Sequence, residues 1–329
     1  MNSWEIFGHD WAVEMLQQHV AHNSLRHAYL FTGPDGVGRR TLALRLAQAL
    51  NCEKPPAPGV PCRTCRTCKQ IQAGTHPDLA ILKREDEKRD LSIGQIRDIG
   101  KFLTYKPYIG AYKVLIIINF DDANIQAQHG LLKTLEEAPA FLIILLTAGN
   151  TEQLLPTIVS RCEIMRLRPL KLDSMQAFLN FNKVPSEKTS FLAHLADGRP
   201  GHALELNDNK KMIAFRNEKL DDLRMLISAK LRDRIRYTEK LVKDKDHFRA
   251  TILIWISFWR DVLMKTSGSQ VELTNIDRSE EIEKLSFRLD RSQVHAITEG
   301  LELAFDRLDR NVNPRLLAEV TLMDWPQVR

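Results

Sequence analysis

Apolar residues in the first half of the chain follow two different patterns. Three segments are continuous apolar runs of strand length, at residues 28–31, 113–118 and 141–146. Two others, at residues 11–20 and 41–50, carry their apolar residues at helical spacing. Strands that are apolar throughout are typical of a parallel sheet with helices on both faces. The pattern therefore predicts an α/β domain over residues 1–167.

The strand pattern fades after residue 167, and helical spacing takes over. Residues 168–208 predict a small domain of three short helices with a turn at Gly198-Arg-Pro-Gly201. Residues 209–329 predict an all-helical domain, since proline does not interrupt residues 210–313. Its helices are expected at residues 211–231, 233–243, 246–266, 279–289 and 291–309, with a last one from residue 314.

Composition and charge narrow the class of protein only slightly. The 329 residues are 43% hydrophobic and 27% charged, which excludes a mainly disordered chain. The net charge of +5 is too small to indicate nucleic-acid binding by itself, although residues 210–249 hold 13 basic and 7 acidic side chains. No apolar run reaches the ~18 residues of a membrane helix, and the N-terminus lacks the features of a signal peptide. We expect a cytosolic protein.

A glycine-rich segment between a predicted strand and a predicted helix is similar to a phosphate-binding loop. Its spacing, Gly33-Pro-Asp-Gly36-Val-Gly38, matches G-x-x-x-x-G, in which backbone N–H groups surround an anion. Arg39 and Arg40 replace the lysine and the hydroxyl residue of the motif, and Thr41 comes one place late. Because one residue turns a helix by about 100°, Thr41 should point away from a metal site. Weak nucleotide binding and a turn that binds nothing both fit this sequence, and Mg²⁺-ATP hydrolysis fits it poorly.

The acidic residues of a phosphoryl-transfer site are also displaced. Ile118 and Asn119 stand at the end of the second apolar run, where a Mg²⁺-binding acid is expected, and Asp121 and Asp122 come later. Two aspartates after a strand are more often a solvated helix cap than a metal site. We therefore favour the cap interpretation and keep a displaced acidic pair as the alternative.

Four of the five cysteines fall within one proline-rich segment at residues 52–77, which we expect to be irregular. Their spacing is Cys52-x9-Cys62-x2-Cys65-x2-Cys68. Four thiolates fit a closed, tetrahedral structural zinc site, and disulfides or an iron–sulfur cluster are weaker alternatives in a cytosolic protein. We interpret His76, which precedes a proline, as a turn residue, and Cys162 as a small buried residue.

An arginine near the end of the α/β domain allows two interpretations. Arg161 stands in Ser160-Arg-Cys162, after the third apolar run. It could form an internal ion pair, or it could be an arginine finger that stabilises charge on a phosphate bound to a neighbouring subunit.

Several short motifs together resemble the bacterial clamp-loader AAA+ subunits. They are His27-Ala-Tyr-Leu-Phe31, the loop at 33–38, the four cysteines, His76-Pro-Asp78, Tyr112-Lys-Val114, Leu131-Leu-Lys-Thr-Leu-Glu-Glu137 and Ser160-Arg-Cys162. Their joint order and spacing carry the resemblance over residues 4–170. Beyond residue 170 it rests on the length of the chain, the helical pattern and Gly198-Arg-Pro-Gly201.

The resemblance implies an AAA+ module, a helical lid and a helical collar that assembles into a hetero-pentameric ring. The implied partners are gamma or tau and delta subunits, with the sliding clamp and primed DNA bound through the complex. The resemblance assigns the zinc to Cys52, Cys62, Cys65 and Cys68. It also assigns to Arg161 a role in trans on the ATP of an adjacent gamma or tau subunit.

Departures from the family pattern point to a ring member that does not hydrolyse ATP. The loop lysine and the acidic pair are lost, and the lid arginine of active members would fall near Gly201, where there is no cation. The sequence offers no explanation for His129-Gly130 in place of Asn-Ala. An active gamma- or tau-like ATPase remains one alternative, and direct DNA binding by the zinc loop or residues 210–249 is another.

Overall fold

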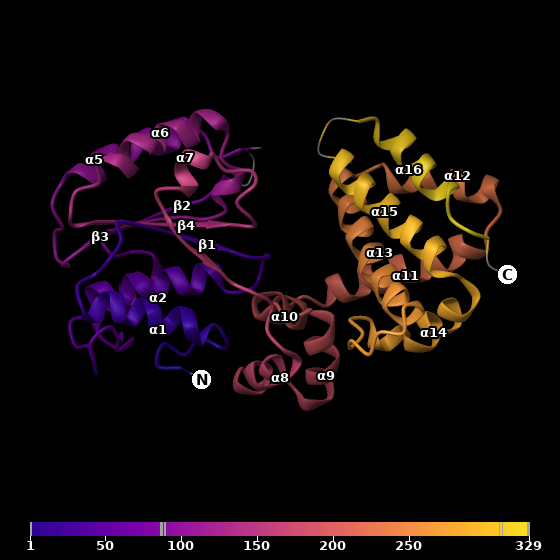
Figure 1. Ribbon diagram of the computed structural model, residues 1–329, viewed down its shortest axis with the longest axis horizontal. Helices are drawn as coiled ribbons and strands as arrows, with labels where there is room; N and C mark the ends of the chain where they lie inside the picture. Colours follow the sequence, from indigo (N-terminus) through magenta and orange to yellow (C-terminus); the bar gives the residue numbers. More distant parts are fainter. Residues whose placement is uncertain (1, 86–87, 89, 309, 311, 328–329) are drawn as a thin grey trace. The chain divides into compact units, whose positions relative to one another are not determined.

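The computed structural model describes residues 2–85, 88, 90–308, 310 and 312–327 (Figure 1). The chain forms two compact units. The first comprises Met1–Phe178 and Gly198–His202, and the second comprises Leu179–Asp197 and Ala203–Arg329. The division into domains at residues 1–167, 168–208 and 209–329 is a different partition of the chain and stays a prediction.

A parallel five-stranded sheet forms the centre of the first unit, which confirms the predicted fold class. Its strand order is β2-β3-β4-β1-β5. The strands are β1 (Ala28–Thr32), β2 (Leu79–Leu82), β3 (Lys113–Ile117), β4 (Leu142–Ala148) and β5 (Glu163–Arg166). The three strands predicted from apolar runs are the three central ones. The apolar pattern did not reveal β2 and β5, because each is a four-residue edge strand and only partly buried.

Helices cover both faces of the sheet (Figure 1). Helices α1 (Asp10–Ala21) and α2 (Arg39–Asn51) lie on one face, and α5 (Gly100–Thr104), α6 (Ile125–Glu136) and α7 (Pro156–Val159) lie on the other. Alternate residues of each strand enter opposite cores, as the pleat requires. Tyr29 and Phe31 pack in the core that contains α1 and α2, whereas Leu30 packs in the core that contains α6 and α7.

The remaining elements of the first unit are short. They are α3 (Arg66–Ala73), α4 (Ile93–Asp98) and the 3₁₀ turn η1 (Phe120–Asp122). The prediction of an irregular segment at residues 52–77 is therefore wrong in part, because α3 lies within it. Ile71 of this helix is buried in the same core as α1 and α2, so packing against the domain stabilises the helix.

The second unit is helical and confirms the predicted all-helical C-terminal region. Helices α8 (Leu172–Phe181) and α10 (Pro200–Asp208) each contain residues of both units, and α9 (Ser186–Leu195) lies in the second. The later helices are α11 (Lys210–Ser228), α12 (Leu231–Leu241), α13 (Lys245–Thr266), α14 (Ser279–Arg288), α15 (Arg291–Leu308) and α16 (Pro314–Met323). Trp325 packs edge-on against Trp255 and Trp259, with ring centroids 5.1 and 5.9 Å apart. Among the described residues, no helix combines the length and the apolar character that crossing a membrane requires.

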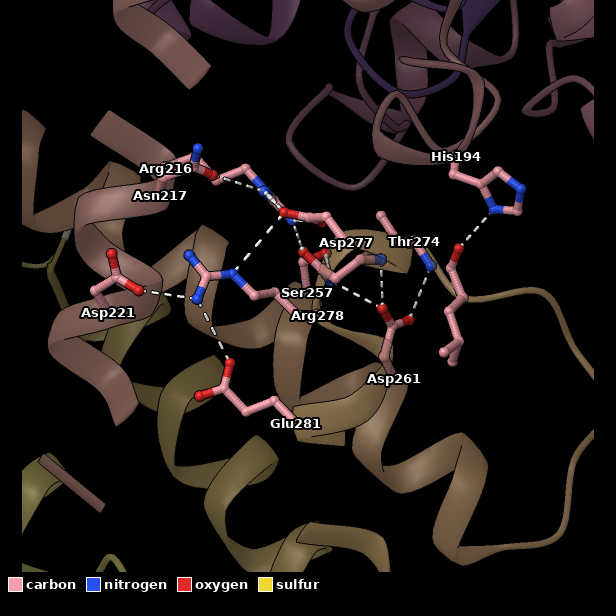
Figure 2. Close-up of polar contacts among 12 residues, drawn as sticks. His194, Arg216, Asn217, Asp221, Ser257, Asp261, Thr274, Asp277, Arg278 and Glu281 are labelled. Carbon is pink, nitrogen blue, oxygen red and sulfur yellow. Dashed lines mark hydrogen bonds and ion pairs between the residues drawn. The ribbon is translucent and has the colours of Figure 1, made fainter. Parts of the chain in front are cut away.

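A buried polar cluster fixes the loop between α13 and α14, which includes the 3₁₀ turn η2 (Ile276–Arg278) (Figure 2). The Asp261 carboxylate accepts the backbone N–H groups of Thr274 and Asn275, at 3.2 and 2.7 Å. The Arg216 guanidinium donates to both carboxylate oxygens of Asp277, each at 2.8 Å. Since α11 carries Arg216 and α13 carries Asp261, the loop holds these two helices together.

Candidate functional site

The glycine-rich loop connects β1 to α2, as the sequence predicts. Gly38 is the residue before α2 and has φ +114°, a conformation that side chains with a Cβ rarely adopt. Gly36 has φ +80°, and a Cβ there would lie 2.8 Å from the backbone nitrogen of His202. The N–H of Gly201 donates to the carbonyl oxygen of Gly36 at 2.7 Å. The start of α10 therefore packs directly on the loop. Gly201, near which the lid arginine of active members would fall, is part of this contact.

The side chain of Arg39 is turned into the protein beside this loop. It is 6% exposed, forms an ion pair with Asp35 and donates from Nη2 to Oδ1 of Asn119 at 3.2 Å. Its Nη1 is buried and has no hydrogen-bond partner among the described residues. Arg40 and Thr41 are exposed. Among the described residues, Arg39 forms side-chain hydrogen bonds or ion pairs beside the loop and Arg40 forms none.

Asp121 and Asp122 do not cap a helix, so the cap interpretation is wrong. The cap of α6 is Asn124, whose Oδ1 accepts the N–H of Ala127 at 2.9 Å. Both aspartates belong to η1, and this turn directs Asp121 toward the end of β4, where Oδ2 accepts the N–H of Gly149 at 2.7 Å. Burial raises the pKa of Asp122, although Arg84 lies 3.4 Å away.

The other Asp121 carboxylate oxygen, Oδ1, is buried and has no hydrogen-bond partner among the described residues. A Cβ at Gly149 would lie 3.0 Å from Asp121 Oδ2 and 3.9 Å from Arg39 Nη1. Asp121 and Arg39 are thus near each other at the carboxyl edge of the sheet. A carboxylate and a guanidinium of this chain therefore lie together beside the glycine loop.

Arg161 lies in the turn that leads from α7 to β5. Its Nη1 donates to the carbonyl oxygen of Thr157 at 3.0 Å, and its Nη2 lies 2.7 Å from Oε1 of Glu136. The side chain remains 35% exposed. Among the described residues no hydrogen bond or ion pair joins Arg161 to the glycine loop. Arg161 thus combines an internal ion pair with access to the surface.

The two residues that flank Arg161 have different surroundings. The hydroxyl of Ser160 donates to the carbonyl oxygen of Thr157 at 3.1 Å. Cys162 is half-buried, and burial raises the pKa of its thiol to about 12. Cys162 therefore stays a neutral packing residue at physiological pH, and it is less buried than the small buried residue that the sequence predicted.

The four clustered cysteines come together in space, with every pair of Sγ atoms within 4.8 Å. A tetrahedral zinc with Zn–S bonds of about 2.3 Å needs sulfur atoms roughly 3.8 Å apart, so the cluster fits this metal with small adjustments. Three backbone N–H groups already point at its sulfurs: Cys62 N–H to Cys52, Cys65 N–H to Cys62, and Cys68 N–H to Cys65, at 3.2–3.4 Å.

The protonation of the cluster follows from these contacts. Burial opposes ionisation of Cys62, but hydrogen bonds from the backbone of Cys65 and Thr64 lower its pKa to about 6. Burial raises the pKa values of Cys52 and Cys68. Since the thiolate is the metal ligand, these hydrogen bonds favour the form of Cys62 that binds a metal.

Residues at the N-terminus anchor the cysteine segment, and the sequence analysis did not find them. Trp4 is fully buried, and its indole N–H donates to the carbonyl oxygen of Gly59 at 2.9 Å. Glu5 forms a two-pronged ion pair with Arg63. The one available signal was a tryptophan and an isoleucine within the first six residues. Large apolar side chains of this kind are typical of a packed segment and not of a free terminus.

His76 and Asp78 form a buried turn rather than part of the cysteine cluster. Nδ1 of His76 accepts the N–H of Asp78 at 3.1 Å, which supports the interpretation of His76 as a turn residue. The carboxylate of Asp78 accepts the N–H groups of Tyr108, Ile109 and Gly110 at 2.6–2.9 Å. Burial opposes ionisation of Asp78, but these bonds hold its pKa below the ordinary value.

Two family models match this chain. One, described as DNA polymerase III, delta subunit, matches residues 8–171, and the other, described as DNA polymerase III, delta subunit, C terminal, matches residues 211–327. The chain belongs to the DNA polymerase III delta subunit family.

Among curated proteins, its relatives include two subunits named delta'. The subunit of Pseudomonas aeruginosa is 38% identical over 136 residues, which cover 41% of each chain. The subunit of Bacillus subtilis is 27% identical over 311 residues, which cover 93% of each chain.

A DNA polymerase III subunit tau is also similar to this chain. The tau subunit of Bacillus subtilis is 26% identical over 345 residues, which cover 97% of this chain and 60% of the tau subunit. The matches therefore span less than two thirds of the Pseudomonas aeruginosa delta' subunit and of this tau subunit.

Proposed function

We propose that this chain is a delta-prime-like subunit of a bacterial DNA polymerase III clamp loader that does not hydrolyse ATP itself. It supplies Arg161 in trans to ATP bound by an adjacent gamma or tau subunit in a cytoplasmic ring that also contains delta. The assembled ring loads the sliding clamp onto primed DNA. The observation that carries the proposal is the contrast between two arginines, since Arg39 is buried beside the chain's own glycine loop and Arg161 reaches the surface.

The contacts of Arg39 argue against ATP hydrolysis at the chain's own loop. A working loop presents a lysine to the β- and γ-phosphates and places an acid on Mg²⁺. Here the cation in the lysine position is committed to Asp35 and Asn119, and one oxygen of Asp121 accepts the N–H of Gly149. Binding ATP would require Arg39 to leave two polar partners. Thr41, the nearest hydroxyl in sequence, is exposed.

The surroundings of Arg161 suit a group that acts on a phosphate outside its own subunit. An arginine always carries its charge and offers donors in a fixed plane. A finger of this kind stabilises charge that develops on the transferred phosphoryl group and can be worth ~10³–10⁵ in rate. Helix α7 ends directly before Ser160, so the turn that follows brings the Arg161 side chain to the surface.

We assign zinc to Cys52, Cys62, Cys65 and Cys68 as a structural metal. Four protein sulfurs complete a tetrahedral shell and leave no position for water or substrate. The metal would supply a cross-link within the cysteine segment, while Trp4 and Glu5 connect that segment to the N-terminus. The proposed role is therefore to stabilise one end of the AAA+ module.

The similarity to tau over 97% of this chain favours one alternative, an active gamma- or tau-like ATPase. ATP hydrolysis by the purified chain separates the two functions. The proposal expects no Mg²⁺-dependent turnover above that of a heat-denatured sample. Steady turnover that disappears when Mg²⁺ is removed would establish the alternative.

The central test is reconstitution with gamma or tau and delta, followed by assays of assembly, DNA-stimulated ATP hydrolysis and clamp loading. Arg161→Ala should leave assembly intact and lower ATP hydrolysis and clamp loading. Arg166→Ala, which changes an exposed arginine of the adjacent strand, is the matched control and should change neither. If Arg161→Ala left DNA-stimulated hydrolysis at the level of the unchanged complex, the assignment of the finger would fail.

A further inference from the structure

The guanidinium of Arg161 is held from two sides by two different helices. Thr157 of α7 accepts a hydrogen bond from Nη1 at 3.0 Å, and Glu136, the last residue of α6, lies 2.7 Å from Nη2. Arg161 and Glu136 are 25 residues apart in the sequence. The two contacts restrain the position of the guanidinium from two sides.

These contacts leave part of the guanidinium free. An arginine has five N–H donors; among the described residues, Nη1 donates one to Thr157, and Nη2 forms the ion pair with Glu136. Other donors of the guanidinium therefore remain for a phosphate. A bidentate contact with a phosphate needs two such donors in one plane. The arrangement thus holds the arginine without using up the donors that a phosphate requires.

The ion pair between Glu136 and Arg161 contributes little to the stability of the fold. Glu136 is 50% exposed and Arg161 is 35% exposed, and ion pairs of this kind add little to the free energy of unfolding because water screens them. The ion pair can matter more for binding, since an unrestrained arginine side chain must be ordered before it can contact a phosphate, and that ordering costs free energy. The pair is therefore better explained by the position of Arg161 than by the stability of the fold.

We propose that Glu136 is a positioning residue that orients Arg161 toward the phosphate of the neighbouring subunit. This inference rests on the proposed function of Arg161. Glu136 itself contacts no substrate, and it acts by holding the guanidinium in the orientation in which it meets the transition state. Its carboxylate meets Nη2 alone, so it restrains the arginine without occupying Nη1 or Nε.

The sequence provides a matched control for this residue. Glu137 is the next residue, is also exposed, and forms no side-chain hydrogen bond or ion pair among the described residues. Glu137→Ala removes the same charge from nearly the same place without touching Arg161. Glu136→Gln keeps an oxygen that can accept from Nη2 and removes only the charge.

The experiment compares these variants in the reconstituted complex with gamma or tau and delta. Glu136→Ala should slow ATP hydrolysis about tenfold at the site that Arg161 contacts, because the Arg161 side chain is no longer oriented. The KM for ATP should be unchanged. Glu136→Gln should retain most of the activity, and Glu137→Ala should behave as the unchanged chain. Assembly, followed by size-exclusion chromatography, should be the same for all variants.

The double variant Glu136→Ala, Arg161→Ala decides whether the two residues act together. If Glu136 works through Arg161, the double variant should be no slower than Arg161→Ala alone. The inference is overturned if the two losses multiply, or if Glu136→Ala hydrolyses ATP as fast as or faster than the unchanged chain. A faster variant would mean that Glu136 restrains the finger. If Arg161→Ala itself has no effect, the proposed function and this inference both fail. If Arg161→Ala slows hydrolysis but Glu136→Ala does not, only this inference fails.

Discussion

Arg39 at the start of α2 donates a hydrogen bond to the side chain of Asn119, two residues beyond the end of β3, with 3.2 Å between the two atoms. Under the proposed function, these residues occupy the places where an active ATPase has its phosphate-binding lysine and its metal-binding acid. The contact joins the residue that follows the glycine loop to the turn that follows β3.

This contact predicts the effect of changing the loop. If the loop does not hydrolyse ATP, as we propose, Arg39→Ala should leave clamp loading by the reconstituted complex close to that of the unchanged chain. The control is Arg40→Ala, since Arg40 is the exposed neighbour. Clamp loading and binding of a fluorescent ATP analogue are the measurements. A large loss of clamp loading with Arg39→Ala alone, in a complex that still assembles, would show that the loop takes part in the reaction.

Removal of the metal should loosen the N-terminal part of the chain. Cys65→Ser combined with Cys68→Ser removes two of the four sulfurs and should abolish zinc binding, measured by elemental analysis of the purified chain. Limited proteolysis should then cut residues 52–77 faster, since the cross-link that orders them is gone. Cys162→Ser lies outside the cluster and should retain the metal. An unchanged zinc content in the double variant would contradict the assignment.

Asp78 should give the first unit a specific pH dependence. The backbone N–H bonds from residues 108–110 lower its pKa in the folded chain, so the carboxylate stabilises the fold fully above the pKa of the unfolded chain, about 4. This stabilisation is lost as the pH falls through the lower pKa of the folded state. Asp78→Asn should lower the free energy of unfolding at pH 7 by roughly 2 kcal/mol, because hydrogen bonds to a charged group are replaced by a poorer set.

The measurement for Asp78 is urea unfolding of the full chain at several pH values. The difference between the unchanged chain and Asp78→Asn should be largest near neutral pH and should shrink below pH 4 or so. Asp98→Asn changes an exposed aspartate and should give a difference near zero at every pH. If the effect of Asp78→Asn were independent of pH, the hydrogen bonds would not depend on the charge of the carboxylate.

The sequence was most informative where structure depends on neighbouring residues. The three apolar runs became the three central strands, and the predicted helices of the C-terminal region begin and end within a few residues of the observed ones. The cysteine spacing predicted the cluster because two C-x-x-C units already bring three sulfurs close together. The edge strands β2 and β5 were missed, because partial burial removes the apolar run that marks a central strand.

Gly130 shows what a sequence cannot explain by itself. A Cβ at this position of α6 would lie 3.3 Å from Ile93 Cγ1 and 3.8 Å from Ile96 Cγ2 of α4. A small residue is therefore favoured because α4 packs closely on α6. Nothing in the residues next to Gly130 reveals this, since α4 lies some 30 positions earlier in the chain.

By itself, the sequence determined the α/β and helical regions, the altered phosphate loop and the four-cysteine set. These features arise from short-range periodicity and spacing, which a linear chain displays directly. Only the tertiary structure paired Arg39 with Asn119, Asp121 with Gly149, Trp4 with Gly59 and Glu136 with Arg161. Each of these pairs joins different segments of the chain, and their contact depends on how strands and helices are aligned in the folded sheet. The physical reason is that a side chain's type limits which partners it can accept, whereas packing decides which of them it reaches.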